Sequence, residues 1–565
     1  MVLQRIIDRL RRDTGAARDK AATPETLDAI LPLLRRDGPA WQERLRAPKR
    51  RRVLVATNVA GFQHASLLES VLAVALTLRG AEVELLLCDA ALPACLKVEP
   101  HAIPDPRTII DGRIDQAICG PCQAVGAQHF GELGLRIHRL STLVPAERRR
   151  AIAATLEGRD RAELSAMVTP AGDRVGMHGL AGALRYYARA HLPEDAAATE
   201  VLRRFVAAAI ATTEAYEALL AGGGDYAAAV FHHGIYVPQG PAGDVLRRHG
   251  IRVVNWNPSY RRSTFIFSHG DTYHYTLMDE PTAAWETMPW GEAQAEEIRA
   301  YLSSRAVGTR DWIWFHEKPE HDTRVFAAEL GLDLSRPIIG MLSNVAWDAQ
   351  LHYPANAFPD MIDWVFRTIE HFARRPELQL LLRIHPAEIR GTVPSAQPLH
   401  AEIARRFPTL PPNVFVIAPE SNISTYAAMA LCDSVLIYGT KTGVELTAVG
   451  IPVIVAGEAW IRNKGLTMDA ASAEAYFALL DRLPLGRRLD EAQRGRALRY
   501  AYHFFFRRMV PLPFIVPAEG KIYALRLDAL GDLAEGRHPG LDVVCNGILD
   551  GSPFVYEAER LGLGE

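Results

Sequence analysis

The stretch "RRVLVATNVAGFQHASLLESVLAVALTLRGAEVELLLCDA", residues 51–90, decides the fold. It opens with an apolar run, which is followed by a loop with Gly61 and His64. Apolar residues then recur at helical spacing up to Gly80, and a second apolar run closes the stretch. Strand, helix and strand in this order build a parallel sheet, whose ligands bind beyond the carboxyl ends of the strands. The stretch therefore predicts a doubly wound α/β domain with a binding edge near residues 58–64.

The same alternation recurs further along the chain. "YAAAVFHHGIYVPQG", residues 226–240, predicts another strand that enters a loop, and a second series of strands and helices begins at residue 335. These patterns predict an α/β protein of two doubly wound, Rossmann-like domains that face each other across a cleft. The expected divisions are a helical extension (1–50), a first domain (51–290), a connection (291–334), a second domain (335–485) and C-terminal helices that partly return to the first domain (486–565).

Composition excludes several classes of protein. The 565 residues are 48% hydrophobic and 23% charged, as in ordinary globular proteins, and the formal net charge of -3 argues against a general nucleic-acid binder. We find no apolar run long enough to span a bilayer. The N-terminal "MVLQRIIDRLRRDTG" mixes charges into a helical pattern, unlike a signal peptide. We expect a cytoplasmic protein, either with this helix packed on the protein or with peripheral contact to the inner face of the membrane.

Four of the six cysteines lie close together in the sequence. Cys119 and Cys122 form a C-x-x-C pair, which can point two sulfurs at one metal ion, and Cys88 with Cys95 could complete a tetrahedral zinc site. The other interpretation is that these are small buried thiols, because Cys88 ends an apolar strand. Both interpretations stay open at this stage.

"LLLRIHPAEIRG", residues 380–391, begins as a buried strand and ends in charged residues. A residue before proline is extended, so the strand ends at His385, and Arg383 projects from the same face. Cationic and hydrogen-bonding groups at the carboxyl edge of a parallel sheet suit a phosphate. In the alternative interpretation Arg383 pairs with Glu388, and His385 caps its own loop.

A second candidate site follows in "LIYGTKTGVELTAVGIPVIVAG", residues 436–457. Its strand-to-helix turn offers backbone N–H groups and hydroxyls at a helix start, where an anion is favoured. Glu445, in the first helical turn, could receive two sugar hydroxyls. Such a turn also serves as an ordinary helix cap. The turn consists of Gly439, Thr440, Lys441, Thr442 and Gly443.

These segments carry a resemblance to a known family. "RIHPAE" (383–388), the run from 420 to 457 and "NKGLT" (463–467) resemble the nucleotide-sugar half of capsule polysaccharide biosynthesis proteins. These are GT-B glycosyltransferases related to bacterial Kdo transferases and, more remotely, to bacterial sialyltransferases. The resemblance implies that His385 with Pro386, and Thr440 with Thr442, contact the phosphate of the donor.

The sequence departs from the family at two places. Lys441 separates two hydroxyl residues that are often adjacent in the relatives. The acidic pair that supplies the general base in sialyltransferases is replaced by His232 and His233. A histidine can still accept a hydroxyl proton, because its ordinary pKa lies near neutrality. Candidates for the base are therefore His233, His64, Glu388 and Asp348.

The resemblance implies a glycosyltransferase that moves a sugar from a nucleotide-activated donor to a growing capsular or other glycan acceptor, free or lipid-linked. No D-x-D motif is present in the sequence, so we expect catalysis without a metal or other cofactor. Hexosyl transfer and Kdo- or sialyl-type transfer both fit. Alternatives are a nucleotide-sugar 2-epimerase and a non-catalytic component of capsule assembly or export. We expect Asn344 to border the donor and Asn58, Gly61 and His232 to face the acceptor.

An aromatic and basic run, "RYAYHFFFRRMVPLPFIVP", occupies residues 499–517. It predicts either a helix that crosses back to the first domain or a surface patch that meets a lipid-linked acceptor.

Overall fold

The computed structural model describes residues 27–305, 310–312, 319–348, 351, 355–391, 393–518 and 521–564. The chain divides into two compact units. The N-terminal unit is formed by Pro24–Thr276 and Phe506–Glu565, and the C-terminal unit contains Leu277–Phe505. Most of the predicted N-terminal helical extension lies outside the described residues; its described part forms α2 and α3. None of the helices in the described ranges combines the length and apolar character needed to cross a bilayer.

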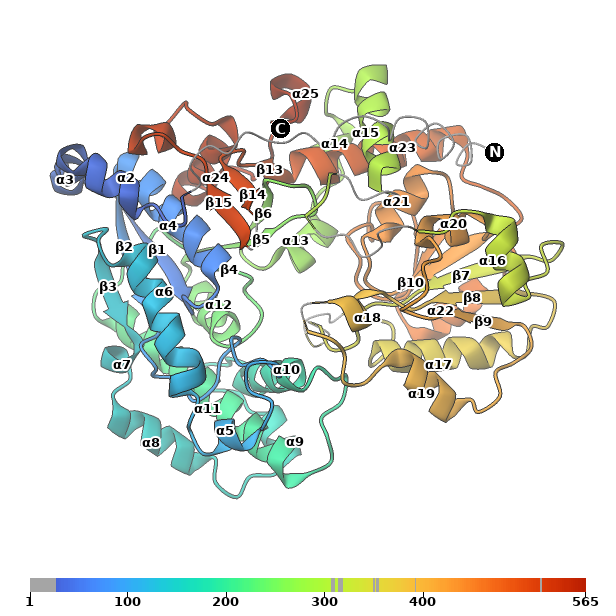
Figure 1. The fold of residues 1–565 in the computed structure, drawn as a ribbon, viewed down its shortest axis with the longest axis horizontal. Helices are drawn as coiled ribbons and strands as arrows, with labels where there is room; N and C mark the ends of the chain where they lie inside the picture. Colours follow the sequence, from blue (N-terminus) through green and yellow to red (C-terminus); the bar gives the residue numbers. More distant parts are fainter. Residues whose placement is uncertain are drawn as a thin grey trace. The chain divides into compact units, whose positions relative to one another are not determined.

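A seven-stranded sheet forms the centre of the N-terminal unit, as far as the unit is described (Figure 1). Its strand order is β13-β6-β5-β4-β1-β2-β3. Neighbouring strands are parallel from β5 to β3, whereas β6 pairs antiparallel with both β5 and the edge strand β13. The strands are β1 (Arg51–Asn58), β2 (Ala81–Leu87), β3 (Arg136–Arg139), β4 (Ala228–His232), β5 (Arg252–Pro258), β6 (Thr264–His269) and β13 (Met509–Pro511), and a separate hairpin pairs β14 (Ile515–Ala518) with β15 (Lys521–Leu525).

Helices cover this sheet because burying their apolar faces against it removes those faces from water. The helix α4 (Gln63–Leu78) joins β1 to β2, and its residues 65–77 are all buried. In Figure 1 the C-terminal strand β13, drawn in red, lies beside the green strand β6, so the chain end completes this sheet. The other helices are α2 (Leu31–Arg36), α3 (Gly38–Arg46), α5 (Arg107–Ile110), η1 (Asp115–Cys119), α6 (Gly120–Phe130), α7 (Leu140–Leu143), α8 (Ala146–Thr155), α9 (Arg161–Ser165), α10 (Val175–Tyr187), α11 (Ala196–Ala221), α12 (Gln239–Arg248), η4 (Leu530–Leu533), α24 (Pro539–Asp550) and α25 (Ala558–Leu561). The helix α13 (Tyr273–Asp279) spans the boundary between the units.

The C-terminal unit is built on a six-stranded parallel sheet, counted over its described residues. Its order is β12-β11-β10-β7-β8-β9, so the direction of strand addition reverses between β7 and β10. Ligands of such sheets bind at this reversal, beyond the carboxyl ends of the strands. The strands are β7 (Ile338–Leu342), β8 (Gln379–Arg383), β9 (Val414–Ile417), β10 (Ser434–Ile437), β11 (Val453–Val455) and β12 (Met468–Asp469).

Short helices connect these strands. They are α14 (Ala283–Glu286), α15 (Glu292–Arg305), α16 (Thr323–Leu330), α17 (Met361–Phe372), α18 (Ala387–Arg390), α19 (Leu399–Arg406), α20 (Thr425–Ala430), α21 (Thr442–Ala448), α22 (Ala473–Leu480), α23 (Glu491–Tyr502) and η3 (His503–Arg507). The predicted fold class, two doubly wound Rossmann-like α/β units in one chain, is confirmed. That the two domains face each other across a cleft stays a prediction.

The aromatic run at residues 499–517 is not a surface patch. The side chains of Phe504, Phe505 and Phe506 are at most 1% exposed. Tyr500 donates a hydrogen bond to the carbonyl of Trp460 (2.5 Å), which fixes the end of α23 in the C-terminal unit. Burial of these rings corrects the lipid-facing interpretation of the segment.

Candidate active site

The polar ends of β7, β8 and β10 form the candidate donor site of the C-terminal unit. The strand β7 lies between the other two, so the residues that follow each strand meet at one edge of the sheet. Ser343 and Asn344 follow β7, His385 follows β8 and Gly439 follows β10. The residues predicted from "RIHP" and "YGTKTG" therefore lie on either side of one central strand.

Ser343 and Asn344 connect the two predicted motifs. The backbone N–H of His385 donates to Ser343 Oγ (3.0 Å), and the backbone N–H of Gly439 donates to Asn344 Oδ1 (3.3 Å). Asn344 was predicted at this edge, whereas Ser343 was missed although it directly precedes Asn344. These two bonds join the His385 loop to the 439–442 turn through consecutive residues.

The imidazole of His385 has a defined orientation. The backbone N–H of Ala387 donates to His385 Nδ1 (3.0 Å), at the start of α18, so the neutral ring carries its proton on Nε2. Pro386 between them is buried. His385 thus caps its own loop, as the alternative interpretation expected, and its remaining N–H is a donor.

Two threonine hydroxyls follow Gly439. Thr440 Oγ1 and Thr442 Oγ1 are 3.1 Å apart, and the backbone N–H of Thr442 donates to Thr440 Oγ1 (3.3 Å). Both residues are partly exposed, whereas Gly443 is buried in the first turn of α21. The turn therefore presents two adjacent hydroxyls at the sheet edge.

Arg383 does not present its charge there. It is 1% exposed, and its guanidinium donates to the carbonyls of Ala418 and Ser421 (3.1 Å for Ser421). Burial lowers the pKa of this guanidinium to about 10. The expected phosphate contact is thus corrected: Arg383 holds the loop that follows β9.

Glu388 is also turned inward. It is 1% exposed and accepts a hydrogen bond from the backbone N–H of Leu399 (2.8 Å). Burial raises the pKa of its carboxyl to about 7. It does not pair with Arg383, and its burial corrects its predicted roles in donor binding and as a competing base.

Glu445 and Lys441 bind each other instead of a ligand. Lys441 Nζ lies 2.8 Å from Glu445 Oε1, and Arg305 Nε lies 3.0 Å from the same oxygen. Arg305 also pairs with Asp311, which accepts a hydrogen bond from the Tyr301 hydroxyl (2.9 Å). Arg305 and Asp311 were missed, because no local sequence pattern connects α15 to the 439–442 turn.

Opposing effects decide the ionisation of Glu445. Burial raises the pKa of its carboxyl, but the charges of Arg305 and Lys441 outweigh burial and lower the pKa to about 2. The carboxylate is 3% exposed and is occupied by its two cations. We therefore correct its predicted role as the receiver of sugar hydroxyls.

Histidines gather at the edge of the N-terminal sheet, beyond β1 and β4. The ring centroids of His64 and His232 are 5.7 Å apart, those of His232 and His233 are 5.5 Å apart, and Tyr523 lies 5.8 Å from His64. His64 and His233 are partly exposed, whereas His232 is 8% exposed. The structure brings together the three histidines that the sequence singled out, which we call the histidine cluster (His64, His232 and His233).

Backbone geometry shapes the end of β4. His233 has a left-handed backbone (φ 69°), and Gly234 follows at φ 81°. A Cβ atom on Gly234 would lie 2.6 Å from the Asn255 side chain, so only glycine fits. This glycine turns the loop, as the sequence also allowed.

Burial governs the charge of the histidine cluster. It lowers the pKa of His64 to about 4, with the Lys97 ammonium lowering it further, and it lowers the pKa of His232 well below its ordinary value. Lys97 Nζ lies 4.7 Å from the Phe62 ring. His64 and His232 are therefore neutral near pH 7.

Asn58 and Gly61, at the end of β1 and in the loop that follows it, make contacts inside the N-terminal unit. Asn58 is 0% exposed; its amide donates to the Ala56 carbonyl (2.7 Å) and accepts from the Tyr216 hydroxyl (2.9 Å). Gly61 donates its backbone N–H to Cys122 Sγ (3.0 Å). The expected acceptor contact of Asn58 is corrected, since its side chain is fully used inside the protein.

The remaining predicted base, Asp348, follows β7 in the C-terminal unit and is exposed. Its role stays a prediction.

The four cysteines, Cys88, Cys95, Cys119 and Cys122, are free thiols. Over the ranges described above, no group of three or more His, Cys, Asp or Glu side chains is arranged to hold a metal ion. Burial raises the pKa of Cys88 to about 11 and that of Cys119 to about 12. Cys95, Cys119 and Cys122 are buried, whereas Cys88 is partly exposed, and a structural zinc site at these residues stays a prediction.

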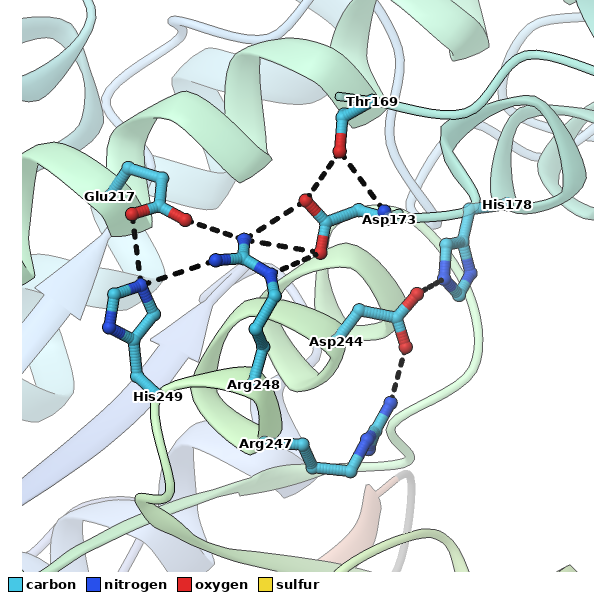
Figure 2. Close-up of polar contacts among 8 residues, drawn as sticks. All are labelled: Thr169, Asp173, His178, Glu217, Asp244, Arg247, Arg248 and His249. Carbon is cyan, nitrogen blue, oxygen red and sulfur yellow. Dashed lines mark hydrogen bonds and ion pairs between the residues drawn. The ribbon is translucent and has the colours of Figure 1, made fainter. Parts of the chain in front are cut away.

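A partly buried contact between His178 and Asp244 fixes the loop after the histidine cluster (Figure 2). His178 Nε2 lies 2.8 Å from Asp244 Oδ2, while His178 Nδ1 lies 3.3 Å from the Ile235 carbonyl. Asp244 also accepts from Arg247 (2.5 Å), and Figure 2 shows its carboxylate between the two partners. The imidazole thus connects α10 and α12 to residues 233–238.

Figure 2 also shows Arg248 between two carboxylates. Its guanidinium lies 3.0 Å from Asp173 and 2.5 Å from Glu217, and His249 lies 3.0 Å from Glu217. These contacts fix the end of α12 against α11 and the segment before α10.

Comparison with known proteins assigns this chain to no family. The sequence matches no known protein-family model, and no curated protein matches it. Among solved structures, the chain is similar to KpsC, a β-Kdo 2,4 transferase of Thermosulfurimonas dismutans (14% identity, 48% of this chain and 79% of that chain, TM-score 0.32). It is also similar to sucrose-phosphate synthase of Thermosynechococcus elongatus (12%, 81% and 95%, TM-score 0.27) and to UDP-GlcNAc 2-epimerase of Neisseria meningitidis (9%, 80% and 95%, TM-score 0.23). TM-scores of this size carry no argument about function.

Proposed function

We propose that this chain is a glycosyltransferase that moves a sugar from a nucleotide-activated donor to a glycan acceptor. The observation that carries the proposal is the connection of His385 to the 439–442 turn through Ser343 and Asn344. It supports a site in which His385, Thr440 and Thr442 share one edge of the parallel sheet, next to the reversal of its strand order. Several neutral donors at such an edge suit a phosphate group.

The donor side supplies hydrogen bonds to a departing phosphate. As the glycosidic bond to phosphate breaks, negative charge grows on the leaving group, and preorganised donors stabilise it. In our proposal His385 Nε2–H and the hydroxyls of Thr440 and Thr442 provide these bonds. Arg383, Lys441 and Glu445 have internal partners and act by holding the adjacent loops.

The acceptor side supplies a base. A neutral histidine can take the proton from an acceptor hydroxyl as it attacks the sugar. His233 is our first candidate and His64 the second, because both are partly exposed members of the histidine cluster. The wider proposal of a capsular or lipid-linked acceptor comes from the resemblance of "RIHPAE" and the 420–457 segment to the capsule family.

The first experiment screens CMP-, UDP-, GDP- and TDP-sugars by thermal shift, because a bound donor stabilises the folded state. Transfer is then measured for the wild type and His385→Ala with the donor that binds. Loss of the imidazole N–H is expected to lower kcat/KM about 100- to 1000-fold.

Two further variants control this test. His385→Asn keeps a side-chain acceptor for the Ala387 N–H but removes the ring, so it is expected to fold normally and transfer poorly. His400→Ala removes an exposed histidine of the same unit and is expected to retain full activity. Wild-type turnover by His385→Ala would contradict the site, and conversion of a nucleotide sugar without acceptor would indicate an epimerase instead.

A further inference from the structure

A buried carboxylate lies under the histidine cluster. Glu69 belongs to α4 and is 0% exposed, within a helix whose residues 65–77 are all buried. A carboxylate inside a protein is costly unless hydrogen bonds or charges compensate it. Its partners therefore indicate why this position is not apolar.

Glu69 binds the ends of two neighbouring strands. Its Oε1 atom accepts a hydrogen bond from the backbone N–H of His232 (2.8 Å) and another from the indole N–H of Trp256 (3.0 Å). The carbonyl of Trp256 in turn accepts the backbone N–H of His233 (3.0 Å). One carboxylate oxygen thus fixes β4 directly and contacts the residue of β5 that holds His233.

His233 needs such support. Its left-handed backbone (φ 69°) is unfavourable for a residue with a Cβ atom. Conformations of this kind persist only where the surroundings determine them. Bonds to Glu69 and to Trp256 hold the chain immediately before and at His233.

We propose that Glu69 is a positioning residue, whose carboxylate holds the ends of β4 and β5 so that His233 presents its imidazole at the acceptor site. The catalytic part rests on the proposed function, in which His233 takes the acceptor proton. The positioning part concerns the conformation of His233 alone.

Two substitutions at Glu69 test whether the accepting oxygen is needed, because one variant keeps this oxygen and the other removes it. Glu69→Gln keeps an oxygen that can accept both hydrogen bonds, so transfer is expected to stay within about threefold of wild type. Glu69→Leu removes both bonds and is expected to lower kcat about 100-fold, the typical contribution of a positioned base. The KM for the donor is expected to stay unchanged, because the donor residues belong to the C-terminal unit.

A double-mutant comparison distinguishes positioning from a general structural role. If Glu69 acts through His233, Glu69→Leu adds little loss to a His233→Ala variant, since the two effects are not additive. If Glu69 only supports the fold, the same loss recurs in both backgrounds, and the proposal is overturned.

A measurement independent of activity completes the test. In NMR spectra of histidine-labelled full-length protein, the ring signals of His233 are expected to shift in Glu69→Leu and to keep their wild-type positions in Glu69→Gln. Unchanged signals in a folded Glu69→Leu protein would overturn the proposal. If the wild type transfers no sugar but the His233 signals still shift in Glu69→Leu, the proposed function is refuted and the positioning role stands.

Should Glu69→Leu fail to fold, Trp256→Phe takes its place. It removes the indole N–H but keeps an aromatic ring, so a smaller shift of the His233 signals is expected. A folded Trp256→Phe protein with unchanged His233 signals would contradict the role of this connection.

Discussion

At the scale of residues, the site combines predicted side chains with partners that the sequence does not display. His385 and Thr440 were predicted at the sheet edge because local patterns, X-Pro and a strand-to-helix turn, place them there. Arg383 has equally suggestive neighbours, yet the structure turns it toward the carbonyls of Ala418 and Ser421. The direction of a long side chain depends on partners that are distant in sequence, so local patterns could not predict it.

The role of His233 is testable at this scale. His233→Ala is expected to lower kcat about 100- to 10,000-fold, because the base that accepts the acceptor proton is lost. Donor binding, measured by thermal shift, is expected to remain. His101→Ala, a change at an exposed histidine of the same unit, serves as the control. A larger loss in His64→Ala than in His233→Ala would assign the base to His64 instead.

At the scale of elements, the strands and helices follow closely from the sequence. The apolar runs that lead into "RIHP" and "YGTKTG" are observed as β8 and β10, because strands buried on both faces need continuous apolar residues. The strand β13 was missed, since Met509–Pro511 is short and follows an aromatic run with no alternation. Its pairing with β6 depends on residues more than two hundred positions away.

The ion pairs at the start of α21 predict an acid-sensitive element. The pKa of Glu445 is about 2 in the folded protein, whereas that of an unfolded glutamate is about 4.3. The folded state therefore gains stability from this carboxylate above pH about 4.3 and loses it as the pH falls toward 2. In Glu445→Gln, the C-terminal unit is expected to lose about 3 kcal/mol at pH 7, because Arg305 and Lys441 lose their common partner.

Urea denaturation at a series of pH values measures this effect. Between pH 4.3 and 2, the unfolding free energy of the wild type is expected to fall more steeply than that of Glu445→Gln. Glu420→Gln, at an exposed carboxylate, is expected to follow the wild type. Parallel curves for Glu445→Gln and the wild type would contradict the ion-pair assignment.

At the scale of the whole molecule, the N-terminal unit is built from two segments of the chain that are separated in sequence by the C-terminal unit. The N-terminal unit takes its last strand and helix from Phe506–Glu565, after the chain has completed the C-terminal unit. The antiparallel pairing of Met509 with Ile266 and the 2.5 Å ion pair of Arg79 with Asp542 hold this segment in place. The N-terminal unit can therefore be complete only when both of its segments are present.

A pair of glycines in this segment tests that dependence. A Cβ atom on Gly540, in α24, would lie 1.9 Å from the Pro511 carbonyl oxygen, whereas one on Gly531 would meet nothing within 4 Å. Gly540→Ala is thus expected to push α24 away from β13 and to destabilise the N-terminal unit by about 1–3 kcal/mol. Gly531→Ala is expected to change nothing measurable.

Hydrogen exchange, measured peptide by peptide, tests this prediction. In Gly540→Ala, protection is expected to fall in 27–276 and 506–564 but to persist in 277–505. Equal loss of protection in both units would show that they unfold as one body, and no loss in either would show that α24 tolerates the displacement.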